Sequence, residues 1–111
     1  MEPSSYIFDW NQPPESMPVP NIEIWDETLR DGLQSPSIVD PPLADKLAIL
    51  RLLVKIGVRG ADLGLPGASQ RQRNHVAALA RMIAQERLPI FPYAAARTLR
   101  SDIAPIADIS Q

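Results

Sequence analysis

The chain has 111 residues, of which 45% are hydrophobic and 22% charged, with a formal net charge of -2 and a pI of about 5.3. This length and balance suit one small globular domain and not a disordered chain. No Lys/Arg cluster suggests a nucleic-acid partner, and no apolar run approaches the roughly 18–20 residues of a membrane span. The absence of cysteine excludes disulfides, thiolate zinc sites and cysteine nucleophiles, and it fits the reducing cytoplasm where we expect the protein to reside.

Residues 1–21 are rich in proline. Proline is incompatible with helix interiors and central strands, so we predict an extended N-terminal arm. Within this arm, Tyr6–Trp10 is apolar enough to dock either on its own domain or on a partner surface.

Residues 22–111 alternate between strand and helix patterns. Short apolar runs predict three strands, at 22–25, 58–65 and 88–96. Apolar residues at helical spacing predict helices at 43–56 and 70–86, and a third helix begins near Thr98 or Ser101. The apolar stripe of the first helix comprises Leu43, Leu47, Ile49, Leu50, Leu53, Val54 and Ile56.

Capping residues punctuate these helices. Asp40, followed by two prolines, is the predicted N-cap of the first helix, and Gly57 is its predicted stop. Ser69 is the predicted N-cap of the second helix, while Thr98 and Ser101 could each open the third.

This order predicts βαβ units and a parallel sheet, an α/β fold. Three parallel strands with two helices leave both sheet edges open and cover the faces poorly. A full (β/α)₈ barrel takes about 250 residues. We therefore expect either the first part of a barrel or a compact fragment that needs a partner.

The charge-dense segment Asp26–Ser35 follows the first strand, where α/β enzymes place chemistry. The Asp31 carboxylate is a hard-oxygen ligand for a divalent cation, and the Arg30 guanidinium can stabilise an oxyanion. Gly32 permits a turn conformation closed to other residues, and Gln34 offers both a donor and an acceptor. The alternative is that these are solvated loop charges or capping groups.

Asp62 lies inside the second apolar run, where an unpaired carboxylate costs several kcal/mol, so we predict that Arg30 is its partner. The alternative is that the Arg30–Asp62 ion pair has a purely structural role. Arg97 follows the third strand, and because parallel strands end at one edge of a sheet, it could lie at the same rim as Arg30 and Asp62. Its position in the sequence is equally compatible with a charge at the start of the third helix. His75 falls in the second helix and is expected to be a surface or capping residue, not a ligand.

The segment Asp26–Pro36 resembles the D-x-T-L-R-D-G-x-Q signature of metal-dependent aldolase-like TIM barrels. These include 2-isopropylmalate, homocitrate and citramalate synthases and 3-hydroxy-3-methylglutaryl-CoA lyase. Asp45–Val58 resembles the first helix of the family, Ala61–Ser69 its I-E-x-G-F-P-x-A-S segment, and Ala95–Ile103 its third strand and following helix. The resemblance covers about residues 22–104 and implies that 22–111 is the N-terminal portion of a TIM-barrel catalytic domain.

The resemblance implies a Claisen condensation of acetyl-CoA with a 2-oxo acid in amino-acid biosynthesis, assisted by a divalent metal acting as a Lewis acid. Asp31 would be a ligand of that metal (Mg, Mn or Zn), and Arg30 would stabilise the enolate or carbonyl oxygen. Gln34, Asp62 and Arg97 would bind the substrate. The complete protein is expected to be a homo-oligomer with no nucleic-acid or membrane partner.

The sequence departs from the family pattern at several points. The family usually has Glu in place of Asp62; Leu33 matches the Gly-Leu-Gln of the lyases, whereas Thr28-Leu29 and Ser35-Pro36 resemble the synthases. An H-x-H metal-binding pair is absent because His75 is the only histidine. We therefore expect the other metal ligands to lie outside this chain and the isolated chain to be inactive. A C–C lyase and a non-catalytic truncated interaction module are the alternatives.

Overall fold

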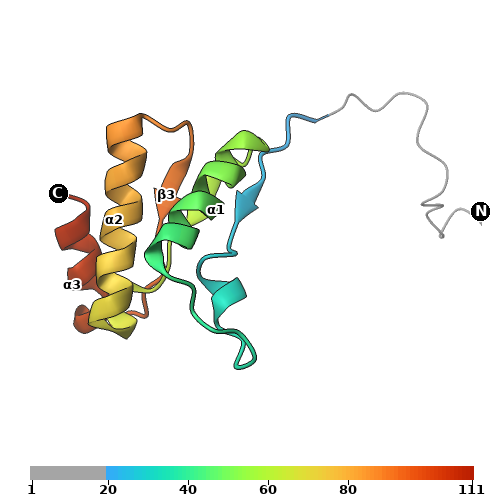
Figure 1. Ribbon diagram of the computed structural model, residues 1–111. Helices are drawn as coiled ribbons and strands as arrows, with labels where there is room; N and C mark the ends of the chain where they lie inside the picture. Colours follow the sequence, from blue (N-terminus) through green and yellow to red (C-terminus); the bar gives the residue numbers. More distant parts are fainter. Residues whose placement is uncertain (1–19) are drawn as a thin grey trace, which may run out of the picture.

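The computed structural model describes residues 20–111, so the predicted arm, including Tyr6–Trp10, falls almost entirely outside the described residues. Strands and helices alternate as predicted (Figure 1). The elements in chain order are β1 (Trp25–Asp26), η2 (Asp31–Leu33), α1 (Leu43–Lys55), β2 (Gly60–Asp62), η3 (Pro66–Ala68), α2 (Gln70–Glu86), β3 (Phe91–Tyr93) and α3 (Arg100–Ile109). Over residues 20–111, every helix is too short or too polar to cross a membrane.

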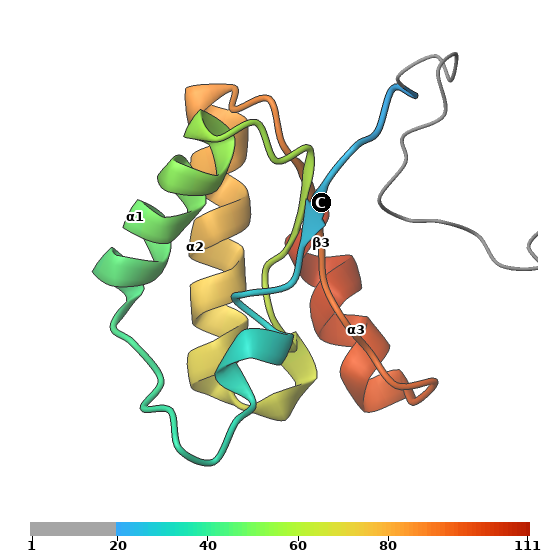
Figure 2. The same cartoon turned by 90° about the vertical axis from the view of Figure 1, so that its right-hand side faces the viewer.

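The three strands form one sheet in the order β1-β2-β3, with both pairs parallel. Trp25 is in register with Gly60, and Asp62 is in register with Tyr93. Helices α1 and α2 lie side by side against one face, and α3 packs next to α2 (Figures 1 and 2). This arrangement confirms the predicted parallel α/β fold, with strands shorter than the apolar runs suggested.

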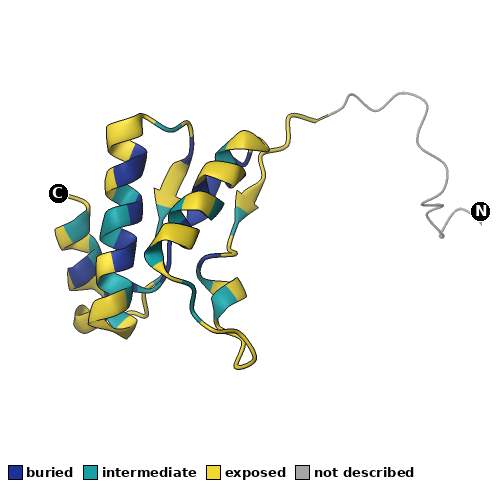
Figure 3. Cartoon of the chain, viewed as in Figure 1, coloured by how far each residue is buried: buried dark blue, intermediate teal, exposed yellow. Residues whose placement is uncertain are grey.

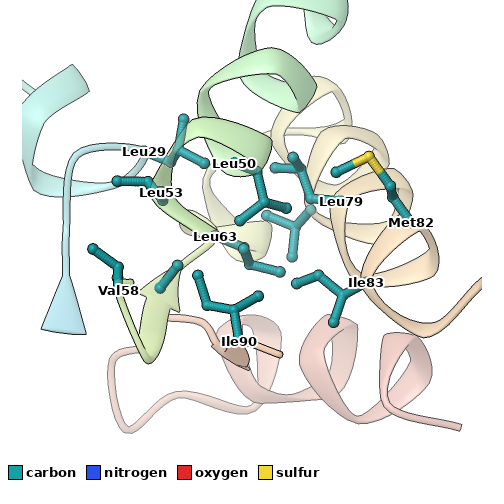
Figure 4. Packing of buried hydrophobic residues seen from close by; sticks show 11 residues of the cluster. Leu29, Leu50, Leu53, Val58, Leu63, Leu79, Met82, Ile83 and Ile90 are labelled. Carbon is teal, nitrogen blue, oxygen red and sulfur yellow. The ribbon is translucent and has the colours of Figure 1, made fainter. Parts of the chain in front are cut away.

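The core lies between the sheet and the helices α1 and α2. Figure 3 shows the buried stripe of each helix turned inward, and Figure 4 shows how these side chains interlock. The buried apolar residues are Leu29, Leu50, Leu53, Val58, Ala61, Leu63, Val76, Leu79, Met82, Ile83 and Ile90. Ile56 was predicted to join this core and is instead exposed, because α1 ends at Lys55 and the chain turns away.

Two predicted helix boundaries are confirmed. The Ser69 hydroxyl accepts a hydrogen bond from the Gln72 backbone N–H at 3.1 Å and so caps α2. Gly57 has a φ of +89°, a left-handed conformation that other residues adopt at a cost, and its N–H donates to the Val54 carbonyl. This turn redirects the chain from α1 into β2.

Two other capping predictions are wrong. Pro42, not Asp40, occupies the N-cap position of α1, and the Asp40 side chain binds cations on two helices instead. Leu99 precedes α3 without a side-chain cap, and Ser101 lies inside the helix. Asp40 is therefore not available as a cap because its carboxylate is committed to Lys46 and Arg71.

The opposite face of the sheet carries an aromatic cluster, defined here as Trp25, Phe91 and Tyr93. The Trp25 ring centroid lies 5.5 Å from that of Phe91 and 5.3 Å from that of Tyr93. The Trp25 ring also covers Gly60, where an added Cβ would lie 2.5 Å from the ring Cδ2. Gly60 therefore provides the space that lets Trp25 reach across β2 to β3.

Replacing Gly60 by Ala should displace the Trp25 ring and lower the free energy of unfolding by about 1 kcal/mol. Urea denaturation followed by circular dichroism measures this cost, and near-ultraviolet circular dichroism reports the ring stack. In a Trp25→Leu background the same Gly60→Ala change should be nearly neutral. An equal cost in both backgrounds would show that the Trp25 ring is not the constraint.

Candidate functional site

The loop after β1 is built by a tight local turn. The Asp26 carboxylate accepts hydrogen bonds from the backbone N–H and the hydroxyl of Thr28, each at 2.9 Å. The Glu27 carbonyl accepts from the Arg30 N–H at 3.1 Å and from the Gly32 N–H at 3.2 Å. Leu29 is buried in the core, which anchors this turn to the protein. The side chain of Arg30 is thereby directed over the sheet edge.

Arg30 lies at the centre of three carboxylates. Its Nε donates to Asp62 Oδ2 at 3.0 Å, its Nη2 binds the Glu27 carboxylate, and its Nη1 lies 3.6 Å from Asp31 Oδ1. The predicted Arg30–Asp62 ion pair is thus confirmed as a contact. The hydrogen bond to Asp62 is the largest cause that raises the pKa of Arg30, so the guanidinium is charged at any ordinary pH.

Asp62 is the fixed member of this group. Its side chain is only 3% exposed, and its second oxygen accepts the Gly64 backbone N–H at 3.1 Å. A buried carboxylate is stable only when it is paired and hydrogen-bonded, and both conditions hold here. Asp62 therefore fixes the Nε side of the guanidinium and leaves the other nitrogens directed toward exposed groups.

Tyr93 and Glu27 also belong to this site, although sequence reasoning missed both. The Tyr93 hydroxyl donates to the Asp26 carbonyl at 3.4 Å. Burial raises the pKa of Tyr93, and Glu27 and Asp62 raise it further, so the phenol stays protonated. The alternation of Phe91 and Tyr93 along the third apolar run was the signal that places Tyr93 beside Asp62.

The remaining predicted residues of the loop face solvent. The Asp31 side chain is 68% exposed, and Gln34 is exposed at the end of η2. Gly32 lies inside η2 with an ordinary φ, so the prediction that it adopts a glycine-specific conformation is wrong. Among residues 20–111, no group of three or more His, Asp or Glu side chains could hold a metal ion.

Arg97 is not joined to the Arg30–Asp62 pair. Its Nε and Nη2 donate to the two Asp102 oxygens at 2.8 and 3.0 Å, and its backbone N–H donates to the same carboxylate at 3.1 Å. Asp102 is buried in the first turn of α3, and Arg97 lowers its pKa. Of the two positions that the sequence allowed for Arg97, the structure therefore shows the charge at the start of a helix.

A second charged cluster holds the far end of the loop. The Lys46 ammonium is buried and lies 2.7 Å from Asp40 Oδ1, and Arg71 Nε donates to Asp40 Oδ2 at 2.9 Å. Burial by itself would raise the pKa of Asp40, but Lys46 and Arg71 outweigh it and lower the value to about 2. Asp40 therefore ties the loop to α1 and α2 together.

His75 adjoins this second cluster and corrects a sequence prediction. It was expected at the surface, yet it is buried, and its Nδ1 has no hydrogen-bond partner among the described residues. Burial is the largest cause that lowers its pKa, followed by the charges of Lys46 and Arg71. The prediction failed because His75 lies one turn before Leu79 and two turns before Met82, on the buried stripe of α2.

Comparison with known proteins gives this geometry a context. A family model described as HMGL-like matches residues 21–108, and the chain belongs to that family, whose domain is a TIM barrel. The three-stranded sheet is therefore an incomplete portion of a (β/α)₈ barrel, as predicted. The Arg30–Asp62 pair lies at the carboxyl ends of β1 and β2, the edge where such barrels place their active sites.

Several relatives that the chain resembles are named as synthases. Homocitrate synthase AksA of Methanopyrus kandleri is 38% identical over 87 residues, which are 78% of this chain and 21% of that protein. The 2-isopropylmalate synthase of Synechococcus sp. (strain WH7803) is 41% identical over 87 residues, 78% of this chain and 16% of that enzyme. The 2-isopropylmalate synthase of Stenotrophomonas maltophilia (strain R551-3) is 37% identical over 90 residues, which are 80% of this chain and 16% of that enzyme. The chain thus spans about a fifth or less of these relatives.

Replacing Asp62 by Asn should lower the free energy of unfolding by roughly 1–3 kcal/mol, because an amide cannot satisfy both Arg30 and the Gly64 N–H as an acceptor. Chemical denaturation measures the loss, and the Arg30 Nε–H signal in nitrogen-15 NMR reports the broken contact. The exposed Asp31→Asn change serves as the control and should cost less than about 0.5 kcal/mol. Equal stability of the Asp62→Asn variant and the wild type would contradict a structural role for the pair.

Asp40 should make stability depend on acidic pH. Its pKa in the folded protein, about 2, lies below the ordinary value, so its contribution is complete above about pH 4 and is lost as the pH falls toward 2. Over this pH range we expect the free energy of unfolding of the wild type to fall by about 1–2 kcal/mol more than that of Asp40→Asn, after allowance for solvent screening. Urea titrations at several pH values measure the difference. The exposed Asp45→Asn variant should keep the wild-type slope.

Proposed function

We propose that this chain supplies the first strands and helices of a metal-dependent acyltransferase barrel that condenses acetyl-CoA with a 2-oxo acid. The observation that supports the proposal best is Arg30, fixed by buried Asp62 at the carboxyl ends of β1 and β2, beside the exposed carboxylate of Asp31. Similarity to 2-isopropylmalate and homocitrate synthases over most of this chain supports the same reaction class.

Arg30 has the properties required of an oxyanion-stabilising residue. Condensation places negative charge on carbonyl oxygens, and a preorganised cation stabilises that charge without having to reorient during the reaction. Its Nε is committed to Asp62, which orients the planar group and leaves Nη1 and Nη2 on the accessible side. We assign Arg30 to the substrate oxygen, and Gln34 and Arg97 to further polar contacts with substrate.

Asp31 fits one position of a divalent metal site, for Mg, Mn or Zn. Its carboxylate is exposed and supplies the hard oxygen that such cations prefer. The described residues supply no cluster of three ligands, so the other ligands come from elsewhere in the barrel. When bound, the metal would polarise the 2-oxo acid as a Lewis acid. Arg30 adjoins Asp31 and would place its charge on the same substrate.

A carbon–carbon lyase of the same superfamily is the second candidate, favoured by Leu33 in the Gly-Leu-Gln order. The two reactions are separated by their substrates. The synthase releases free CoA from acetyl-CoA only when a 2-oxo acid is present, whereas the lyase cleaves a 3-hydroxyacyl-CoA. Both assays belong on the same preparation, because the arginine and the metal ligand serve either direction of carbon–carbon bond chemistry.

The test uses the polypeptide encoded by the whole reading frame that carries these residues. We expect CoA release that depends on both a 2-oxo acid and a divalent metal, and a loss of roughly 100-fold or more in kcat/KM for Asp31→Asn. The 111 residues alone should release no CoA. Asp45→Asn, an exposed carboxylate of α1, is the charge-matched control and should retain full activity. An Asp31→Asn enzyme with unchanged metal dependence would disprove the ligand assignment.

A further inference from the structure

The carboxylates around Arg30 differ in how firmly they are held. Asp62 is buried and hydrogen-bonded through both oxygens, so it stays in place. The Glu27 side chain is 47% exposed, and its one hydrogen bond among the described residues goes to Arg30 Nη2. The Glu27 backbone is fixed by the turn, because its carbonyl accepts two N–H groups. Its side chain can therefore leave the guanidinium without any movement of the main chain.

Nη2 is also the nitrogen that an incoming anion would need. With Nε committed to Asp62, the free edge of the Arg30 guanidinium consists of Nη1 and Nη2. A carboxylate binds a guanidinium best through two parallel N–H···O bonds along one edge. Glu27 already takes one of the two N–H groups of Nη2, and two carboxylates at one nitrogen repel each other, so a carboxylate ligand and Glu27 compete for Nη2.

Glu27 also faces the side of the sheet where a substrate would lie. Glu27 binds Arg30, which also binds Asp62, and Asp62 is in register with Tyr93 of the aromatic cluster. The charge of Glu27 contributes, after burial, to the raised pKa of Tyr93. A 2-oxo acid bound at Arg30 would enter this same space.

We propose that Glu27 is a displaceable internal competitor that occupies Arg30 until the carboxylate of the 2-oxo acid replaces it. This assignment rests on the proposed function for the identity of the substrate. Glu27 stabilises the charged arginine in the free protein and weakens substrate binding by the cost of its displacement. Exposed ion pairs are weak, so this cost is small enough for a small anion to overcome.

The test measures binding of pyruvate, the simplest abundant 2-oxo acid, to the nitrogen-15-labelled 111-residue chain without metal. The Arg30 Nε–H signal and neighbouring amides report the titration. Glu27→Gln should bind pyruvate roughly fivefold more tightly than wild type, since it removes a competitor of exposed-pair strength. Glu23→Gln is the matched control: it changes net charge equally, its carboxylate lies near Trp25 Nε1, and its affinity should stay within about 1.5-fold of wild type.

Three results would overturn the proposal. If Glu23→Gln increased the affinity for pyruvate as much as Glu27→Gln does, the effect would be due to net charge. If Glu27→Gln bound pyruvate no more tightly than the wild type, Glu27 would not be a competitor. Absence of pyruvate binding in both proteins would also reject the competitor role.

The proposed function and the competitor role of Glu27 are tested by different measurements, so each can be rejected without the other. It is tested by CoA release from the whole reading frame, whereas this inference is tested by pyruvate affinity without turnover. Tighter pyruvate binding with no CoA release under any condition would reject the acyltransferase and retain a carboxylate site at Arg30. In an active enzyme, Glu27→Gln should lower the KM for the 2-oxo acid by a similar factor and change kcat less, and an unchanged KM would reject the inference alone.

Discussion

The burial of one carboxylate organises this structure. Asp62 ends β2 with its side chain almost wholly removed from water, a position that requires an opposite charge and a full set of hydrogen bonds. Gly64 supplies one hydrogen bond from the chain itself. Arg30 supplies the charge, and it can do so only if the loop after β1 returns over the sheet edge. The conformation of the loop therefore follows from the need to neutralise Asp62, and the site that we propose follows from that loop.

The same loop is held at both ends by different forces. Leu29 anchors its start by apolar burial in the core, and Asp40 anchors its end between Lys46 and Arg71. Between these anchors the side chains from Gln34 to Val39 are exposed. Rigid ends with an accessible middle are what a binding loop requires, because the charged groups keep their geometry while the span between them stays open to ligands.

The sequence predicted what depends on local pattern. Helix periodicity predicted α1 and α2, and the convergence of parallel strand ends predicted the Arg30–Asp62 pair. The errors concern choices among partners. His75 was misjudged because its environment depends on how α1 and α2 pack. Arg97 was left open because a residue just past a strand end can either join the polar groups at the rim of the sheet or charge the start of the next helix. Spacing along the chain cannot decide between these two positions, and three-dimensional packing does.

The aromatic cluster bears on the strength of the site. Trp25 is 49% exposed and Phe91 60% exposed on the face opposite the helices, and Tyr93 connects that face to the charged edge. In a closed barrel of the HMGL-like family, this face would line the interior, where further strands would exclude water. A lower local dielectric strengthens every interaction of the Arg30 guanidinium, with Asp62, with Glu27 and with any substrate oxygen. Closure of the barrel would therefore strengthen the binding of Glu27 to Arg30 and also the stabilisation of a substrate oxygen by Arg30. Both effects depend on buried Asp62, which fixes the position of the guanidinium.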